Sequence, residues 1–363
     1  MELRMIMRIA TFTIILGLIY TCQTAFAQRD TLRYDTSYYE RFTRKLIVTP
    51  FLVKNLSAFS VATPEVENKV RYYSNSPVGL GLRVGFDWLS LSASYGVGVI
   101  DPDFNKAKGK TKALNLQTSF LAKKFLIDVY FQNYKGLYMR ADAMPPYTSE
   151  LFYVRPDVTS KLLGVNGVWV FNGKKFSARP AFKFDVWQKK SAGSLLAGIE
   201  FLSGSARGDS SLVPSAYKNS YPQAQINKMS YMLFGPSLGY GHTFVINRHF
   251  FITGIGALNA DAGYVKEYKT GFAETVDQRW RFDPNINFRG GIGYNKPEWE
   301  IAFSYFTKRV FLTGKSNDNR YLAHNNDYRL SYTRRLNAGK TIPKVVDWAG
   351  NIIEKLGFGF LIR

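Results

Sequence analysis

Apolar and polar residues alternate with a period of two along most of the chain beyond residue 45. In the clearest segment, 78–86, every second residue from Val78 to Phe86 is large and apolar, and the residues between them are glycines and Arg83. Successive side chains of a β-strand point to opposite faces, so this alternation predicts a strand with one apolar and one polar face. We therefore expect an all-β protein.

Thirteen segments show the alternation. It is clear in 78–86, 89–97, 114–120, 125–132, 176–187, 286–294, 299–306 and 325–336, and weaker in 46–61, 162–171, 195–203, 231–246 and 250–259. A bacterial transmembrane barrel has an even number of strands. We therefore expect about twelve wall strands, in a range of about 12 to 14. The alternation breaks around 188–194, and we expect the odd segment to be explained within residues 188–228.

The connections between these segments alternate between short and long. Short turns are predicted at 87–88, 122–124, 172–175, 247–248 and 295–297, and long loops at 62–75, 100–110, 139–158, 207–228 and 262–280. Tight periplasmic turns and long outer loops are typical of an antiparallel transmembrane β-barrel. A soluble β-sandwich or lipocalin-like barrel would also alternate, but its polar face would carry most of the charge. Here that face is rich in glycine, serine and asparagine.

The first 27 residues have the layout of a secretory signal peptide. Arg4 and Arg8 precede an apolar run, and Ala25 and Ala27 give the small-residue cleavage pattern before Gln28. This run is too short to span a bilayer, and no other stretch approaches about 18 uninterrupted apolar residues. A membrane-spanning form of this chain would therefore cross the membrane with strands.

The single cysteine, Cys22, lies inside this signal, so cleavage would leave no thiol for a disulfide or a metal site. The alternative is a lipoprotein acylated at Cys22. Acylation signals have small residues just before the cysteine, and Tyr20 and Thr21 fit that pattern poorly.

Four segments follow from these patterns. We expect a signal peptide over 1–27, an N-terminal periplasmic segment over 28–44, a barrel over 45–336 and an amphipathic C-terminal tail over 337–363. Apolar residues recur in the tail with a loosely helical spacing, which predicts a short periplasmic helix packed against the barrel rim. A helix on the membrane surface and a final short strand are the other interpretations.

The charge balance is strongly basic. Removal of residues 1–27 takes Arg4, Arg8 and Glu2 from the 48 basic and 27 acidic residues, which leaves a net charge of +20. For an exported chain, lipid phosphates and lipopolysaccharide are the expected partners, and nucleic acid is not. The 23 tyrosines and 28 phenylalanines suit the aromatic girdles of a barrel in the outer membrane. Insertion would use the barrel-assembly machinery, and the oligomeric state is left open.

Four strings carry a resemblance to a known family. They are YYSNSP at 72–77, KGKT at 108–111, YKG at 134–136 and QKKSAGS at 188–194. With them the chain resembles, over most of its mature length, a Bacteroidota outer-membrane barrel family catalogued as domain of unknown function 4421. The resemblance implies an outer-membrane barrel and carries no activity.

Ten charged residues are expected to face the lumen. Five are basic and five acidic: Arg83, Asp128, Arg179, Lys183, Asp185, Glu200, Arg289, Glu300, Asp327 and Arg329. A barrel of about twelve strands has a narrow interior, and buried charges are tolerated there only when partnered. The set predicts either a salt-bridged plug or the lining of a small hydrated channel.

The sequence offers only weak candidates for a catalytic or metal-binding site. The chain has three histidines, His242, His249 and His324, and none stands in a recognisable nucleophile and base arrangement. The 101–105 segment, DPDFN, lacks the spaced glycine and glutamate of a calcium loop. We therefore expect no cofactor, no metal and no enzymatic activity.

Three functions remain for such a barrel. They are a narrow channel for small solutes, a structural or partner-binding barrel, and, with the least support, a lipid-modifying enzyme.

Overall fold

The structure is a computed structural model. It describes residues 34–42, 44–64, 70–87, 89–96, 107–122, 125–140, 152–177, 185–269, 275–314 and 319–355. The elements are β1 (Tyr39–Arg41), β2 (Lys45–Ala62), β3 (Val70–Ser74), β4 (Gly79–Phe86), β5 (Leu89–Gly96), β6 (Lys112–Ala122), β7 (Phe125–Arg140), β8 (Phe152–Val170), β9 (Val186–Gln188), β10 (Ala192–Arg207), η2 (Ser215–Tyr217), β11 (Ile226–Ile246), β12 (Phe250–Lys269), β13 (Thr275–Asn295), β14 (Trp299–Thr313), β15 (Arg320–Asn337) and α3 (Thr341–Ile353).

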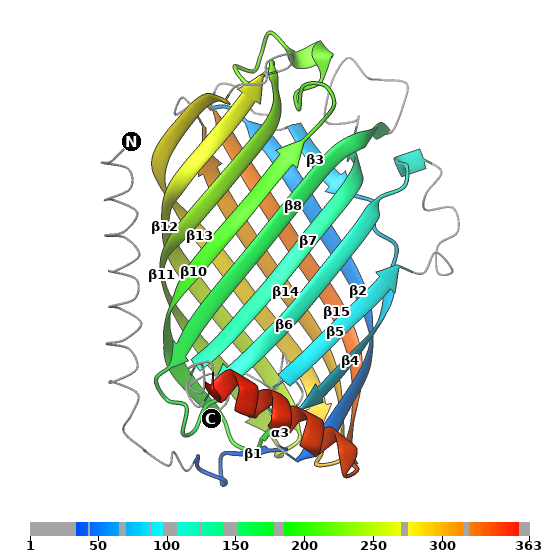
Figure 1. Cartoon of the computed structure of the whole chain (residues 1–363), viewed down its shortest axis with the longest axis vertical. Coiled ribbons are helices and arrows are strands. Elements are labelled where there is room, and N and C mark those ends of the chain that lie inside the picture. Colours follow the sequence, from blue (N-terminus) through cyan, green and yellow to red (C-terminus); the bar gives the residue numbers. More distant parts are fainter. Residues whose placement is uncertain are drawn as a thin grey trace.

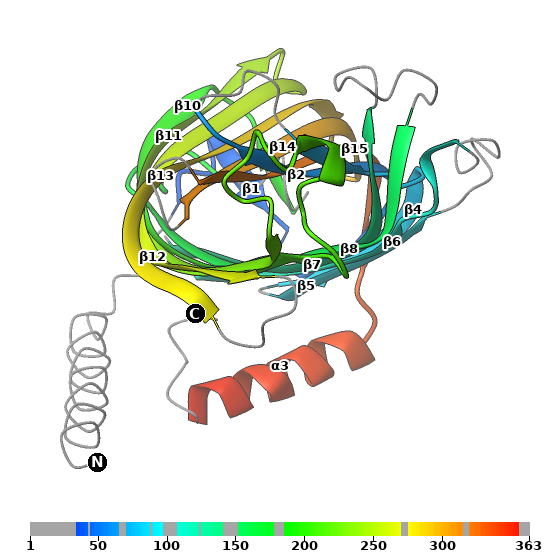
Figure 2. The same cartoon turned by 90° about the horizontal axis from the view of Figure 1, so that it is seen from above.

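Twelve antiparallel strands close into a barrel (Figures 1 and 2). The order around the wall is β2, β4, β5, β6, β7, β8, β10, β11, β12, β13, β14 and β15. The ring closes where β15 pairs with β2, from Arg320 opposite Ala62 to Asn337 opposite Lys45. The predicted twelve-strand all-β barrel is confirmed. We call the end where the chain enters β2 and leaves β15 the turn end, and the opposite end the loop end.

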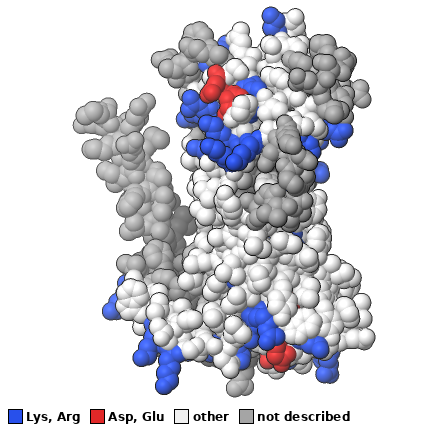
Figure 3. All heavy atoms as spheres, turned by 90° about the vertical axis from the view of Figure 1, so that its right-hand side faces the viewer, with Lys and Arg blue, Asp and Glu red and all other residues white. Residues whose placement is uncertain are grey.

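The outward face of the wall is apolar. Leu238 on β11, Leu258 on β12 and Phe282 on β13 are 64%, 65% and 67% exposed. Figure 3 shows a wide band of uncharged side chains between basic side chains toward the two ends. Soluble monomers seldom expose apolar patches larger than several hundred Å². This exterior therefore suits contact with lipid.

Aromatic side chains flank this band near both ends. At the turn end, neighbouring rings run from Phe250 through Tyr294 and Trp299 to Tyr332, with centroid separations of 4.7, 5.5 and 6.5 Å. Nearer the loop end, Tyr264 and Trp280 lie 6.4 Å apart. Such girdles mark the two interfaces of a bilayer in transmembrane barrels.

Strands β3 and β4 follow one another along β2. The first pairs with residues 58–61 and the second with residues 46–53. The other edge of β3 pairs directly with β7, whereas β5 and β6 lie between β4 and β7 nearer the turn end. Near the loop end, β3 therefore links β2 directly to β7. Nearer the turn end, β4, β5 and β6 fill the wall between β2 and β7.

Three of the four strings that carry the family resemblance meet at this junction. The Asn75 amide donates to Thr111 Oγ1 at 2.7 Å, and the Asn75 side chain donates to the Gly109 carbonyl. The Thr111 hydroxyl in turn donates to the Gly136 carbonyl. These conspicuous residues therefore join β3, β6 and β7.

One predicted wall strand, 176–187, is wrong. Its described part contains a turn region and β9, which pairs with β1 in a separate two-stranded sheet. Phe176 and Val186 are buried there, and residues 178–184 lie outside the described residues. The odd segment thus lies before, and not within, residues 188–228.

The predicted long loops also needed correction. Most of 262–280 forms the ends of β12 and β13, and β8 begins at Phe152 inside the predicted loop 139–158. Outward residues there, such as Tyr264 and Lys266, are no longer aliphatic. The apolar alternation therefore fades while the strand continues.

The C-terminal tail forms the helix α3, as expected, and the apolar run 356–362, on which the alternative of a final strand falls, lies outside the described residues. Val346 is buried against Phe86 of β4, while Val345 and Trp348 are 57% and 64% exposed. Figure 2 shows α3 outside the ring of strands. Among the described residues, no helix has the length and hydrophobicity needed to cross a membrane.

A substitution at Gly136 tests the wall junction. Gly136 has φ +85°, and a Cβ there would lie 2.4 Å from the Lys110 carbonyl oxygen. We expect Gly136→Ala to destabilise the barrel by about 1–3 kcal/mol, because strain and backbone collision add. The measurement is the temperature at which the folded band is lost in heat-modifiable gel electrophoresis. Gly85→Ala is the control, since its nearest neighbours lie at 3.6 Å; equal shifts for the two variants would contradict the prediction.

Candidate functional site in the barrel interior

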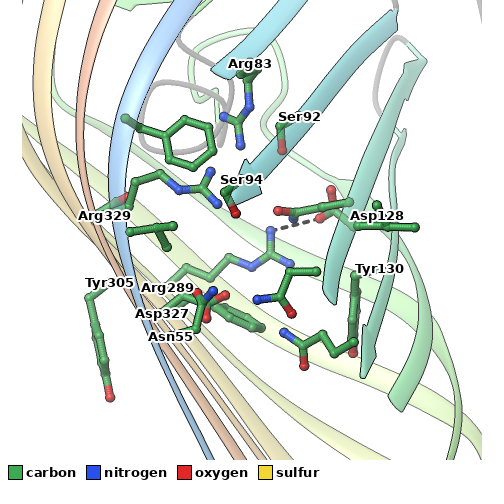
Figure 4. Close-up of a pocket in the computed structure, with 18 of the residues that line it drawn as sticks. Asn55, Arg83, Ser92, Ser94, Asp128, Tyr130, Arg289, Tyr305, Asp327 and Arg329 are labelled. Atoms are coloured by element: carbon green, nitrogen blue, oxygen red, sulfur yellow. Dashed lines mark hydrogen bonds and ion pairs between the residues drawn. The ribbon is translucent and has the colours of Figure 1, made fainter. Parts of the chain in front are cut away.

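A polar cavity of about 90 Å³ lies inside the barrel (Figure 4). Small side chains create the space, because Ser90, Ser92 and Ser94 follow one another on the inward face of β5. Larger polar residues surround it from β2, β4, β6, β7, β13 and β15: Asn55, Arg83, Asn115, Gln117, Asp128, Gln132, Arg289, Asp327 and Arg329.

Three guanidinium groups point into this cavity from different strands. Figure 4 shows Arg83, Arg289 and Arg329 converging near Ser94. The Arg289 Nη1 atom lies 2.9 Å from Asp128 Oδ2, an ion pair that crosses the lumen from β13 to β7. Asp327 lies beside Arg289 in the same view. Acidic and basic groups are thus brought together in one place.

Aromatic rings hold two of these cations. The Arg329 guanidinium lies 4.3 Å from the centroid of the Phe51 ring, and that of Arg289 lies 4.9 Å from the Phe306 ring. Phe51 fits because its partner position on β4 is Gly81, where a Cβ would come within 2.3 Å of the ring. Cation–π contacts of this kind are strongest when desolvated.

Two further ion pairs cross-link the interior. Glu200 of β10 pairs with Lys308 of β14, and Asn259 donates to the same carboxylate at 3.2 Å. Arg335 Nη2 lies 2.7 Å from Glu300 Oε2, and both side chains are fully buried. Buried charges need such partners, because desolvation of an unpaired charge is costly.

The ten predicted lumen residues therefore fall into four groups. Arg83, Asp128, Arg289, Asp327 and Arg329 line the cavity, and Glu200 and Glu300 form separate buried pairs. Asp185 precedes β9 and lies beside Arg83 in a smaller pocket, so its placement in a wall strand is wrong. Arg179 and Lys183 lie outside the described residues.

The sequence reasoning missed the partners Lys308 and Arg335. Each continues the inward phase of its strand, Lys308 two residues beyond the predicted end at 306 and Arg335 within 325–336. Extending the phase of β14 would have found Lys308, and following the phase within 325–336 would have found Arg335.

The loop-end half of the interior is filled by an apolar cluster. Residues 208–225, which we call the lid, contribute Leu212, Val213 and Tyr221. They pack with inward residues of the wall: Phe59, Tyr72, Tyr134, Leu137, Met139, Leu162, Leu202, Met229, Tyr231, Leu233 and Tyr321. Burial raises the pKa of the Tyr221 hydroxyl, which keeps it neutral.

Hydrogen bonds fasten the lid to the wall. The Tyr72 hydroxyl donates to the Leu212 carbonyl at 2.7 Å, and Arg155 Nη1 donates to the Ser211 carbonyl at 2.9 Å. Arg155 also pairs with Asp157, whose carboxylate accepts the amide of Asp209. The lid is therefore ordered by the side chains of β3 and β8.

The turn end is filled by residues 34–42, 171–177 and 185–190, which we call the plug. Phe176 packs with Leu196 and Ile255 on the inward face of the wall. Asn295 Nδ2 donates to the Val186 carbonyl at 3.1 Å, and the Arg335 guanidinium lies 4.4 Å from the Phe42 ring centroid. The described residues thus occupy the interior at both ends.

The histidines lie among aromatic side chains or near other polar groups. His249 stacks on Trp187 at 5.3 Å and on Tyr294 at 5.4 Å, and His242 lies 4.2 Å from Phe244. Among the described residues, no group of three His, Cys, Asp or Glu side chains could hold a metal ion. The weak calcium candidate at 101–105 lies outside the described residues.

Comparisons with known proteins add a family and several distant structures. A family model described as a domain of unknown function (DUF4421) matches residues 33–333. No curated protein matches the chain in sequence.

Solved structures match at low similarity. The outer-membrane protease OmpT from Escherichia coli is 10% identical, with a TM-score of 0.37 over 82% of this chain and 98% of that chain. The COG4313 outer-membrane channel from Pseudomonas putida F1 is 13% identical, with a TM-score of 0.35 over 82% and 98%. The translocator domain of the autotransporter NalP from Neisseria meningitidis is 6% identical, with a TM-score of 0.33 over 91% and 98%. At these values the likeness carries no inference about activity.

A substitution at Lys308 tests the buried pairing. Lys308→Met leaves the fully buried Glu200 carboxylate without its cation, and we expect a loss of about 3–5 kcal/mol in stability. Glu200→Leu combined with Lys308→Met should recover most of it, because an apolar pair leaves no uncompensated charge. Denaturant titration of the protein in detergent micelles measures both. Lys218→Met on the exposed part of the lid is the control, and a double variant no more stable than Lys308→Met would contradict the pairing.

Proposed function

We propose that the chain, which belongs to the DUF4421 family of domains of unknown function, is an outer-membrane β-barrel with a closed interior. In this proposal it serves as a structural or partner-binding protein of the envelope, and not as an open pore. The observation that carries the proposal is the packing of the lid and the plug at the two ends of the interior, with an ion pair across the lumen between them.

The exterior supports the location. The wall exposes large aliphatic and aromatic side chains from β2 around to β15, and aromatic residues gather near both ends. Antiparallel barrels with such an exterior are the form in which strands span an outer membrane.

The interior supports closure. Barrels of about eight strands are filled by their own side chains or hold one small ligand, whereas porins of about 16–18 strands leave an aqueous channel, so for twelve strands the contents of the interior decide. Here the ion pair Arg289–Asp128 crosses the middle of the lumen, and apolar residues of the lid and plug lie on either side of it. A solute would have to displace packed side chains at both ends.

The turn end supports a role in binding. Closing a barrel needs only tight turns there. This chain adds a two-stranded sheet of β1 and β9 and the helix α3, whose residues Val345, Trp348 and Ile352 are exposed. The helix therefore presents exposed apolar side chains at the turn end, which suits contact with another envelope component.

Conductance separates a closed barrel from a channel. Purified protein in planar bilayers is expected to give no discrete conductance steps at low or high salt, because the lid and plug block the lumen. An open porin inserted under the same conditions is the positive control. Reproducible steps that change with Arg289→Ser or Arg329→Ser would refute closure.

A gated narrow channel is the second candidate. The observation in its favour is the polar cavity at mid-lumen together with a lid that is held by hydrogen bonds from Arg155 and Tyr72. Such a lid could move without unpairing any strand.

Releasing the lid tests this second candidate. Arg155→Ala removes the bonds to Ser210, Ser211 and Asp157 and should loosen the lid. The closed-barrel proposal expects this variant to stay silent in bilayers, because the plug remains. Conductance in Arg155→Ala, and in no variant that keeps the lid bonds, would favour the gated channel.

A further inference from the structure

Five basic residues form a contiguous stripe on the outward face of the barrel. They are Lys112 on β6, Lys135 on β7, Lys161 on β8, Arg207 on β10 and Lys228 on β11, five strands that follow one another around the wall. The first four side chains are exposed and Lys228 is half-buried. We call this set the basic stripe.

The strand register places like charges directly opposite one another in this stripe. Lys112 is the cross-strand partner of Lys135, and Arg207 is the partner of Lys228. Thr159 is the partner of both Lys135 and Arg207, and Lys161 lies on the same strand one outward position nearer the turn end, opposite Asn133 and Ser205. Like charges that face each other across two strands destabilise a sheet. The register therefore maintains a repulsion that an external anion would relieve.

The described acidic residues do not neutralise the stripe. None of the ion pairs between described residues includes any of its five members. The carboxylate of Asp157, on the same strand as Lys161, is held by Arg155 and by the amide of Asp209. Lys228 lies 4.4 Å from the ring centroid of Tyr268, a contact that orients its ammonium group without cancelling the charge.

The stripe lies at the loop-end margin of the apolar exterior. Toward the turn end, the outward positions that follow are Leu114 and Leu116 on β6, Leu163 on β8, and Met232 and Phe234 on β11, all exposed. Figure 3 shows basic side chains gathered on the loop-end side of the uncharged band. The headgroups of the loop-end leaflet lie at this level of a bilayer.

We propose that the basic stripe binds the phosphate groups of an anionic lipid headgroup, that of a phosphorylated glycolipid in the loop-end leaflet. The inference rests on the outer-membrane location in the proposed function and does not depend on closure of the lumen. Five neighbouring strands span about 19 Å at about 4.8 Å per strand. That length accommodates more than one phosphate. The lysines act as mobile point charges, and Arg207 can bind a phosphate through two N–H groups.

Native mass spectrometry of the full chain in mild detergent tests the stripe. The probes are diphosphorylated lipid A, the same lipid with both phosphates removed, and inorganic phosphate alone. The stripe variant carries Lys112→Gln, Lys135→Gln, Lys161→Gln, Arg207→Gln and Lys228→Gln. The control variant loses the same five charges away from the stripe, by Lys174→Gln, Lys218→Gln, Lys296→Gln, Lys340→Gln and Lys344→Gln. Heat-modifiable mobility establishes that each variant is folded.

The wild type and the control variant are expected to retain diphosphorylated lipid A, and the stripe variant to lose at least about tenfold in affinity, since five charge contacts are removed. Retention should fall as ionic strength rises. Equal retention by the stripe and control variants overturns the proposal, as does equal binding of the dephosphorylated lipid. Binding of inorganic phosphate as tight as that of the lipid would assign the stripe to free anions and also overturn it. The lipid assay does not depend on whether the barrel conducts ions. Failure of the closed-barrel proposal and failure of the lipid proposal can therefore be told apart.

Discussion

The pairing of charges inside a narrow ring is the interaction on which the rest of the structure depends. Twelve strands enclose too little space to hydrate every inward side chain. A charge on one strand must therefore meet its partner on another, as Arg289 on β13 meets Asp128 on β7 and Lys308 on β14 meets Glu200 on β10. These pairs join strands that do not neighbour one another in the wall. They fix the cross-section of the barrel and obstruct the lumen at the same time.

The interior has three levels along the barrel axis, and a different kind of side chain fills each of them. The loop-end level uses large aromatic side chains such as Tyr72, Tyr134 and Tyr231, together with the lid. The middle level holds the cavity with its arginines, and the turn-end level receives the plug. Arg335 connects the last two, because it pairs with Glu300 in the wall and lies on the Phe42 ring of the plug. Closure of the barrel and folding of the N-terminal segment are therefore coupled.

Period-two alternation predicted the barrel class because lipid outside and packed side chains inside repeat the same two-faced environment on every strand. It failed at 176–187 because β9, at the end of that segment, pairs with β1 and not with a wall strand. It ended β12 and β14 too early. Toward the loop end Val265 and Val310 are buried on the inward face while Lys266 and Arg309 lie outward, so the contrast between an apolar outer and a polar inner face is lost. The partner of each lumen charge could not be predicted, since pairing across the interior depends on the strand tilt and stagger of the whole ring.

The interior and the outward face of the barrel differ in how their charges are balanced. The chain has a formal net charge of +21. Among the buried side chains of the described residues, however, four are basic (Arg83, Arg155, Lys308 and Arg335) and six are acidic (Asp128, Glu200, Asp261, Glu267, Asp283 and Glu300). The buried side chains that the structure describes therefore carry no excess of positive charge. Charges inside find partners because the protein supplies them. The stripe on the outward face of β6 to β11 places like charges opposite one another instead, and we therefore propose for it an anionic partner from outside the chain.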